Sequence, residues 1–325
     1  MAAVQRDPAV DAVPVTARLR DVGFWAEWAA AVGLVAIVLV FGVLDATFLS
    51  IGNIEALLVS AAMLVILAVG QSFVIASAGI DLSIASTMTF AAVVLGWAYA
   101  SGWGTAMSCV AAVIAGAAVG CLNGLLVAKA KITDFVVTLG SLSAASAGAL
   151  ILSGGNPRDV ESMFLLQFTT GSIGPIGYPV IAAAVIAVVA HVVWFRTRFG
   201  VHLLATGGNN EAARAMGINT ARVKIAVYTM SGVLAGVAAI LLVSRIGAAE
   251  PAANLNYLLN SVAAVVLGGV SLYGGKGTVL GPVLGALLLT SLVNGLTLLG
   301  VSQFYQPLAV GVIVVAAAFL ARYQR

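Results

Sequence analysis

The sequence predicts an all-α, polytopic membrane protein. Of its 325 residues, 62% are hydrophobic and only 8% are charged, whereas soluble domains carry about 25% charged residues. The mean hydropathy is +1.11. The apolar runs are continuous over about 20 residues, the length that a helix needs to cross the hydrocarbon of a bilayer. An outer-membrane barrel would instead show alternating strands of about 10 residues, so we expect a helical bundle.

The apolar runs divide the chain into about ten transmembrane helices, some of them broken or re-entrant, within a transmembrane domain at 28–321. Residues 1–27 are polar and predict a mobile cytoplasmic tail, and 322–325 form a second cytoplasmic tail. The first apolar run is long for a signal-peptide core, so we expect it to be retained. The expected spans are 28–48, 54–78, 83–101, 105–128, 133–153, 178–196, 223–246, 257–273, 279–299 and 302–321.

The basic residues orient these spans. With the amino terminus inside, all 15 Lys and Arg residues fall on the inside except Arg158 and Arg245. The positive-inside rule therefore predicts that both termini are cytoplasmic. This topology places the long loop 154–177 outside and the long loop 197–222 inside.

Two polar, glycine-containing stretches interrupt the apolar pattern. The first, 79–83, contains Asp81, and an ionisable residue between two membrane-length runs is costly. Asp81 is a candidate for lining a pathway, or for capping the helix that follows it. The second stretch is 268–275, and paired interruptions of this kind point to a transport pathway. Residues 74–96 and 264–286 share this pattern, which suggests a weak parallel repeat.

The cytoplasmic loop 197–222 predicts a two-turn helix between Gly207-Gly208 and Gly217. An asparagine caps its start, Glu211 lies in its first turn, and Gly217 ends it. Its alanine-rich face is small enough to seat in a groove of a partner, and Arg214 is a candidate for pairing across that interface. The alternative is a surface helix that only fills the loop. The candidate docking residues are Gly207, Gly208, Asn209, Asn210, Glu211, Ala212, Ala213, Arg214 and Gly217.

Amide and hydroxyl side chains within the apolar segments are the remaining pathway candidates. Amides both donate and accept hydrogen bonds, which suits sugar hydroxyls, although bonds between helices explain them equally well. The candidates are Gln71, Asp81, Ser83, Asn123, Asn260 and Asn294. Glycines spaced by four, such as Gly116, Gly120 and Gly124, predict close helix packing.

No enzymatic or cofactor chemistry is expected in the chain. Cys109 and Cys121 fit packing roles inside apolar runs, and two separate histidines make no metal site. The stretch 274–278 fails as a phosphate-binding loop, because Lys276 is followed by Gly277 rather than by Ser or Thr. The basic residues form no patch with interleaved aromatics, so no nucleic-acid partner is expected.

Several motifs resemble those of the ribose-type monosaccharide permeases of ATP-binding cassette importers. Over about 50–320 the chain shows five blocks in the order and spacing of that family. They are 79–83 (Gly-Ile-Asp-Leu-Ser), 123–129 (Asn-Gly-Leu-Leu-Val-Ala-Lys), 136–140 (Val-Val-Thr-Leu-Gly), 263–281, and 294–301. The chain departs from the family pattern at Ala78, where glycine is common, at Asp134, where proline is common, and at Asn260, where an acid is usual.

The resemblance implies a multi-pass transporter subunit of the bacterial inner membrane, with the loop 154–177 in the periplasm, and not an enzyme. Two permease copies, identical or related, would form the pathway in the lipid, and cytoplasmic ATPases would dock at 207–219 and use ATP and Mg. A periplasmic binding protein would deliver a monosaccharide, moved by alternating access. The alternatives are the same permease type for a nucleoside, a polyol or a branched-chain amino acid, and an autonomous channel or carrier. The last alternative would leave the 207–219 loop unexplained.

Overall fold

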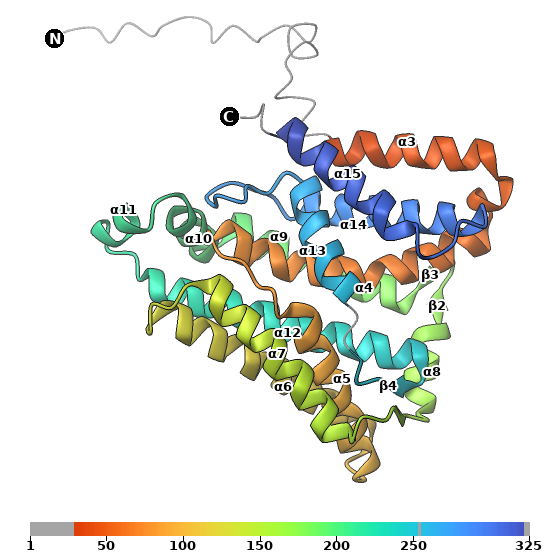
Figure 1. Ribbon diagram of the computed structural model, residues 1–325, viewed down its shortest axis with the longest axis horizontal. Helices are drawn as coiled ribbons and strands as arrows, with labels where there is room; N and C mark the ends of the chain where they lie inside the picture. Colours follow the sequence, from red (N-terminus) through yellow and green to blue (C-terminus); the bar gives the residue numbers. More distant parts are fainter. Residues whose placement is uncertain (1–28, 253–254, 322–325) are drawn as a thin grey trace, which may run out of the picture.

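The computed structural model describes residues 29–252 and 255–321, and both expected tails, 1–27 and 322–325, lie outside the described residues. The described chain is mostly helical (Figure 1). The helices are α3 (Ala29–Leu44), η1 (Ala46–Leu49), α4 (Ile51–Ala76), α5 (Ile84–Ala100), α6 (Gly104–Ala128), α7 (Asp134–Ser153), α8 (Met163–Thr170), α9 (Tyr178–Arg196), α10 (Arg198–Gly208), α11 (Asn210–Ala215), α12 (Thr220–Ile246), α13 (Leu255–Leu267), α14 (Leu280–Leu298) and α15 (Gln306–Ala321).

Six of these helices are long and apolar enough to cross a membrane, namely α4, α6, α7, α9, α12 and α14. Four shorter helices, α3, α5, α13 and α15, are also apolar. The helical membrane fold is thereby confirmed, while the number of crossings stays a prediction. Each of these helices overlaps one expected span.

Two expected spans end clearly earlier in the structure than the sequence predicts. The span expected at 257–273 ends at Leu267, because Gly268 and Gly269 follow and the φ of Gly269 is +75°. The span expected at 28–48 ends at Leu44, and Asp45 then caps the short helix η1 by accepting a hydrogen bond from the Thr47 amide at 2.8 Å. Glycine conformation and a side-chain cap therefore override the continuous apolar pattern.

The loop 154–177 is more ordered than the sequence indicates. It contains the two-turn helix α8, and its strand β1 (Arg158–Asp159) pairs antiparallel with β4 (Ala248–Ala249), next to the end of α12. Strands β2 (Ser172–Ile173) and β3 (Ile176–Gly177) form a small hairpin. In Figure 1, α8 and β4 lie at the end of the molecule opposite α10 and α11. The two long loops therefore occupy opposite ends, as the expected topology requires.

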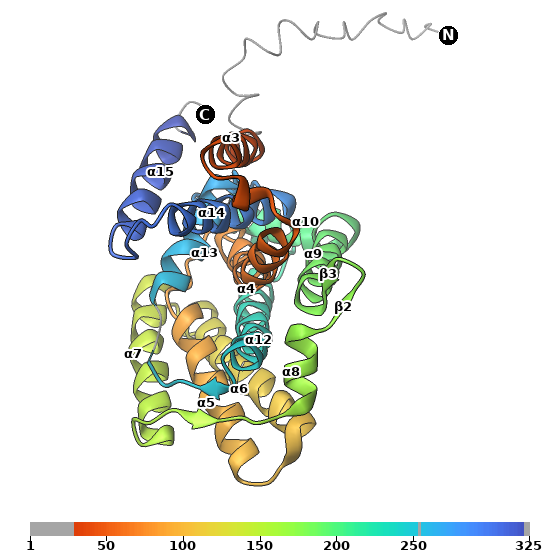
Figure 2. The same ribbon diagram turned by 90° about the vertical axis from the view of Figure 1, so that its right-hand side faces the viewer.

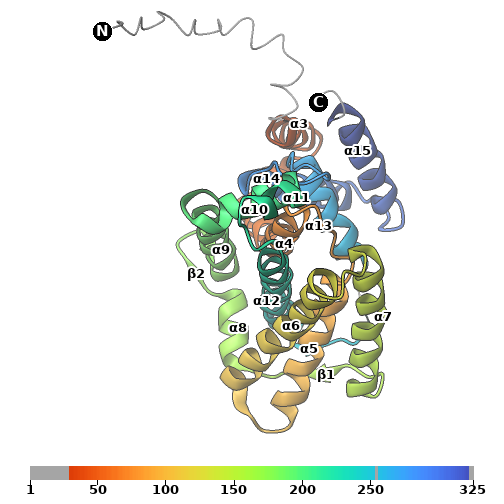
Figure 3. The same cartoon turned by 90° about the vertical axis from the view of Figure 1, so that its left-hand side faces the viewer.

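Helix α4 is the centre of the bundle. It packs against α12, α14, α9 and α13, and Figures 2 and 3 show it surrounded by these helices. Of its most apolar 18-residue window, 83% is buried, against 22% for α7. An apolar helix buried in this way has protein on all sides, whereas α7 leaves most of its surface for lipid or another subunit.

Glycines allow α6 and α12 to pack backbone to backbone. A Cβ added at Gly116 would overlap the carbonyl oxygen of Gly232, and one added at Gly120 would overlap that of Tyr228. Such small-residue faces let membrane helices approach closely and gain van der Waals contact. The glycines spaced by four therefore have the packing role that the sequence predicts.

We expect Gly120→Ala to lower the stability of the protein, because α6 or α12 must shift to admit the methyl group. Overpacking of this kind costs about 1–3 kcal/mol. The matched control is Gly140→Ala on α7, where an added Cβ meets nothing within 4 Å. Thermal unfolding in detergent checks this, and an equal melting temperature for the two variants would contradict the packing account.

Candidate coupling and pathway sites

Asp81 lies buried in the helix break between α4 and α5, and its hydrogen bonds hold the break in place. Its side chain is only 2% exposed. One carboxylate oxygen accepts hydrogen bonds from the Ser83 amide (2.9 Å) and hydroxyl (2.7 Å), and the other accepts one from the Ser231 hydroxyl on α12 (2.8 Å). A buried carboxylate is tolerated when its oxygens are hydrogen-bonded in this way.

The hydrogen bonds continue from Asp81 into two more helices. The side-chain nitrogen of Asn123 on α6 donates to the Ser83 hydroxyl at 2.9 Å. The side-chain oxygen of Asn123 accepts a hydrogen bond from the Ser141 hydroxyl on α7. The structure thus brings three of the predicted residues, Asp81, Ser83 and Asn123, into one network. The prediction of Asp81 as the N-cap of α5 is wrong in detail, since Ser83 holds that position and makes no side-chain cap bond.

The backbone of the break is held by α7 and α12. The amide of Ile80 donates to the Asp134 carboxylate at 2.7 Å. The carbonyl of Ile80 accepts from the Tyr228 hydroxyl at 3.1 Å and from the Thr138 hydroxyl at 3.4 Å. Asp134, one of the departures from the family pattern, therefore satisfies a backbone donor that the broken helix leaves unpaired.

The other pathway candidates do not join this network. Gln71 in α4 is fully buried, and neither polar atom of its amide has a partner among the described residues. Asn294 exchanges two hydrogen bonds with Asn53, at 2.9 and 3.0 Å, at the opposite end of α4 from the break. Asn260 is half-buried on α13. The six candidates therefore do not line a single continuous site.

The loop 197–222 contains two helices where the sequence predicts one. The predicted helix is α11: the Asn209 side chain accepts from the Ala212 amide at 2.9 Å, and Gly217 ends the turn with a φ of +84°. The prediction misses α10, whose last two residues are Gly207 and Gly208. Glycine has a low helix propensity, and tertiary packing overrides it here.

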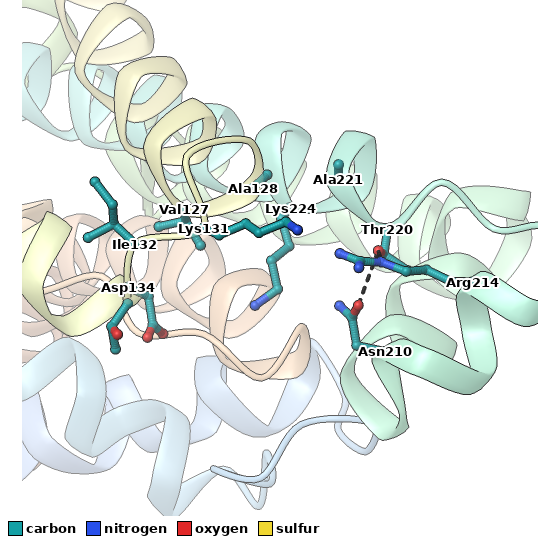
Figure 4. A pocket seen from close by; sticks show the side chains of 11 residues that line it. Val127, Ala128, Lys131, Ile132, Asp134, Asn210, Arg214, Thr220, Ala221 and Lys224 are labelled. Carbon is teal, nitrogen blue, oxygen red and sulfur yellow. Dashed lines mark hydrogen bonds between the residues drawn. The ribbon is translucent and has the colours of Figure 1, made fainter.

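Helix α11 has an inward and an outward face. Ala213 is buried, and the Arg214 Nε donates to the Thr220 hydroxyl at 2.8 Å, which itself donates to the Asn210 side chain at 3.3 Å (Figure 4). Arg214 is exposed and binds Thr220 of its own chain through Nε alone, so its pairing across an interface stays a prediction. A further exposed residue that the sequence did not reveal is Met216 at the end of α11, whose side chain is 83% exposed; Glu211 in the first turn is exposed as well. Its signal was a large apolar residue directly before the terminating glycine.

Helix α10 meets both interrupted segments. The Gly275 amide of the second segment donates to the carbonyl of Ala76 at the end of α4, at 3.0 Å. Gly207 lies against the same carbonyl so closely that an added Cβ would overlap it. Cβ atoms added at Gly274 and Gly275 would lie 2.7 Å from Gly207 O and Gly208 Cα. Three segments far apart in the sequence thus pack backbone to backbone.

We expect Ala78→Gly to stabilise the protein. Ala78 has a φ of +54° and an exposed side chain, and the left-handed region costs an alanine about 1–2 kcal/mol. Part of this gain is offset by the greater freedom of glycine in the unfolded chain. The control is Ala118→Gly on an exposed face of α6, which should lose about 1 kcal/mol. A fall in melting temperature for both variants would contradict the strain at Ala78.

We expect Asp81→Ala to destabilise the protein by about 3 kcal/mol or more, because it leaves the Ser83 and Ser231 groups buried without their acceptor. Asp81→Asn keeps one acceptor oxygen and should lose less. Thermal unfolding in detergent ranks the three proteins. A residue that only lines a pathway would give Asp81→Ala an unchanged melting temperature and a loss of transport alone.

Comparison with known proteins identifies the chain as a permease component. Residues 53–321 match the family described as "Branched-chain amino acid transport system / permease component". The ribose import permease protein RbsC of Bacillus subtilis is 36% identical over 292 residues, which cover 89% of this chain and 91% of that protein. No solved structure matches the chain.

Two further relatives carry names of other sugars. The L-arabinose ABC transporter permease protein AraH of Azospirillum brasilense is 35% identical over 98% of this chain and 94% of its own length. The D-allose transport system permease protein AlsC of Escherichia coli K12 is 32% identical over 92% of each chain. The matched range and these relatives together cover nearly all of the described structure. The chain belongs to the family of transport-system permease components to which the match at residues 53–321 assigns it.

Proposed function

We propose that this chain is the membrane-spanning permease subunit of an ATP-driven importer in the bacterial inner membrane. Its cargo is a monosaccharide, delivered by a periplasmic binding protein and moved by alternating access. Relatives named for ribose, arabinose and allose support the sugar. The observation that carries the mechanism is the packing of α10 against the two interrupted segments through Gly207, Ala76 and Gly275.

The proposed ATPase docks on the outward face of α11. This short segment presents the exposed Glu211 and Met216, while the Nε of Arg214 is bonded to Thr220. An exposed acid and an exposed large apolar side chain on one segment suit a small interface with an apolar centre and a charged rim. ATP and Mg are used by the partner, and the permease itself holds no cofactor. The ATP-driven movement therefore enters the permease through α11 and its neighbour α10.

Movement of α10 reaches the helix breaks without passing through flexible side chains. Gly207 touches the end of α4 directly, and Gly274 and Gly275 touch α10. Packed backbones resist compression, so α10 and both breaks move as one body. The Asp81 network then connects this body to α12 through Ser231 and to α6 through Asn123. Each conformational change of the docked ATPase would thereby change the orientation of the helices around the pathway.

In the proposed arrangement ten helices cross the membrane, namely the six long apolar helices and the four shorter ones. Both termini and the loop 197–222, which we call the coupling loop, then face the cytoplasm. A second permease copy, identical or related, completes the pathway. The weakly buried α7 offers one surface for lipid or for that copy. A branched-chain amino acid is a weaker candidate cargo, because the sugar-named relatives match along nearly the whole chain.

Transport in proteoliposomes that contain this chain, its ATPase and its binding protein tests the proposed coupling. Glu211→Arg should lower ATP-dependent sugar accumulation by at least roughly tenfold, because placing a like charge at an interface costs several kcal/mol. Gly208→Pro should have the same effect through the geometry of α10. The matched control is Glu161→Arg, an equal charge reversal at an exposed residue of the opposite loop. Equal uptake without the ATPase, or by Glu211→Arg, would make an autonomous carrier the better account.

A further inference from the structure

A polar pocket of 260 Å³ lies where four segments meet at the coupling-loop end of the molecule (Figure 4). The end of α6, the start of α7, helix α11 and the start of α12 each contribute to its wall. Its lining residues are Val127, Ala128, Lys131, Ile132, Thr133, Asp134, Asn210, Arg214, Thr220, Ala221 and Lys224. None of the pathway candidates lines this pocket, so the pocket is separate from the hydrogen-bond network at Asp81.

The lining carries three cations and one carboxylate. Lys131, Arg214 and Lys224 come from three different segments, and none of them forms an ion pair with a residue that the structure describes. The carboxylate of Asp134 already accepts the Ile80 amide at 2.7 Å. The pocket therefore has an excess of two positive charges, with donors free to bind an anion.

The cations have hydrogen-bonding capacity to spare. Arg214 uses its Nε for Thr220, which leaves its two terminal nitrogens for a ligand. Among the described residues, the half-buried Lys224 makes one long hydrogen bond, 3.4 Å to the carbonyl of Ala78. Lys131 is exposed at the pocket and held in a left-handed conformation, with a φ of +56°. Several convergent cationic donors around a cavity of this size suit a phosphate group, which offers several acceptor oxygens.

The surroundings favour a lipid as the source of that phosphate. Large apolar side chains next to the pocket, Ile132, Phe135 and Val136, are 42%, 52% and 59% exposed. They lie at the start of α7, where a membrane helix enters the hydrocarbon, so acyl chains would cover them. Basic pockets between helices at the cytoplasmic surface are suited to anionic headgroups. A free phosphate would gain nothing from this apolar border.

We propose that this pocket binds the phosphate of an anionic phospholipid headgroup, held by Lys131, Lys224 and Arg214. The bound headgroup would lie between α11 and the break at 77–83, since Lys224 also contacts Ala78. A lipid of the inner leaflet would thereby stabilise the position of α11 against the ends of α6 and α12. The inference requires the cytoplasmic placement of this end and is independent of the identity of the transported solute.

Native mass spectrometry of the delipidated permease, titrated with phosphatidylglycerol or phosphatidylcholine, tests the site. Wild type should bind phosphatidylglycerol more tightly than phosphatidylcholine. Each of Lys131→Gln and Lys224→Gln should weaken phosphatidylglycerol binding roughly fivefold, as expected for one cation near a lipid phosphate. The matched control is Arg222→Gln, an equal charge loss at an exposed residue of α12 outside the pocket. Melting temperatures of all variants verify that they are folded.

Three outcomes would overturn the proposal. Equal losses in Arg222→Gln and in the pocket variants would show a general charge effect. Displacement of phosphatidylglycerol by an equal concentration of inorganic phosphate would show a site for free phosphate. Loss of ATPase binding in the pocket variants, with lipid binding unchanged, would show that an acidic segment of the partner fills the pocket. Selective loss of phosphatidylglycerol binding in Lys131→Gln and Lys224→Gln would support it.

Discussion

The structure depends on how the backbone groups at two helix breaks are satisfied. A helix that ends within a membrane protein leaves carbonyl and amide groups without intrahelical partners, and each costs several kcal/mol if it stays unpaired away from water. Here the partners come from distant segments. The Ala76 carbonyl receives the Gly275 amide, the Ile80 amide is bound by Asp134, and the Ile80 carbonyl is bound by Tyr228. Pairing the breaks therefore fixes the arrangement of α4, α7, α12 and α13–α14.

The same requirement connects the proposed coupling loop, residues 197–222, to the interior of the helix bundle. Helix α10 packs against the end of α4 only because residue 207 is glycine, so the loop cannot move without moving the break beside it. Asp81 extends this connection to α12, and Asn123 extends it to α6. Two packings of these helices around one network would supply the discrete states that alternating access needs. In the proposed mechanism Asp81 acts by holding these helices together, because both of its carboxylate oxygens are bound to Ser83 and Ser231.

The apolar lengths were enough to predict where the helices lie, because hydrocarbon thickness and backbone pairing leave few alternatives. The helix at α11 was predictable from its capping asparagine and terminal glycine. The sequence did not reveal α10, since Gly207 and Gly208 argue against a helix unless their packing partners are known. It did not reveal the direction of Arg214 or the role of Asp134 either. Both depend on residues far away in the chain, Thr220 and Ile80 among them, that only the tertiary fold brings near.

The proposed coupling requires α10 and the second break to move as one body during the ATP cycle. Spin labels test this requirement, placed pairwise at Val201 on α10, Leu272 and Phe164 after Cys109 and Cys121 are replaced by alanine. All three labelled side chains are more than half exposed. Distances are measured by pulsed electron resonance in the complex with its ATPase, with and without ATP. We expect a constant distance between 201 and 272 and a changed distance between 201 and 164. A change between 201 and 272 as large as that between 201 and 164 would contradict the coupling.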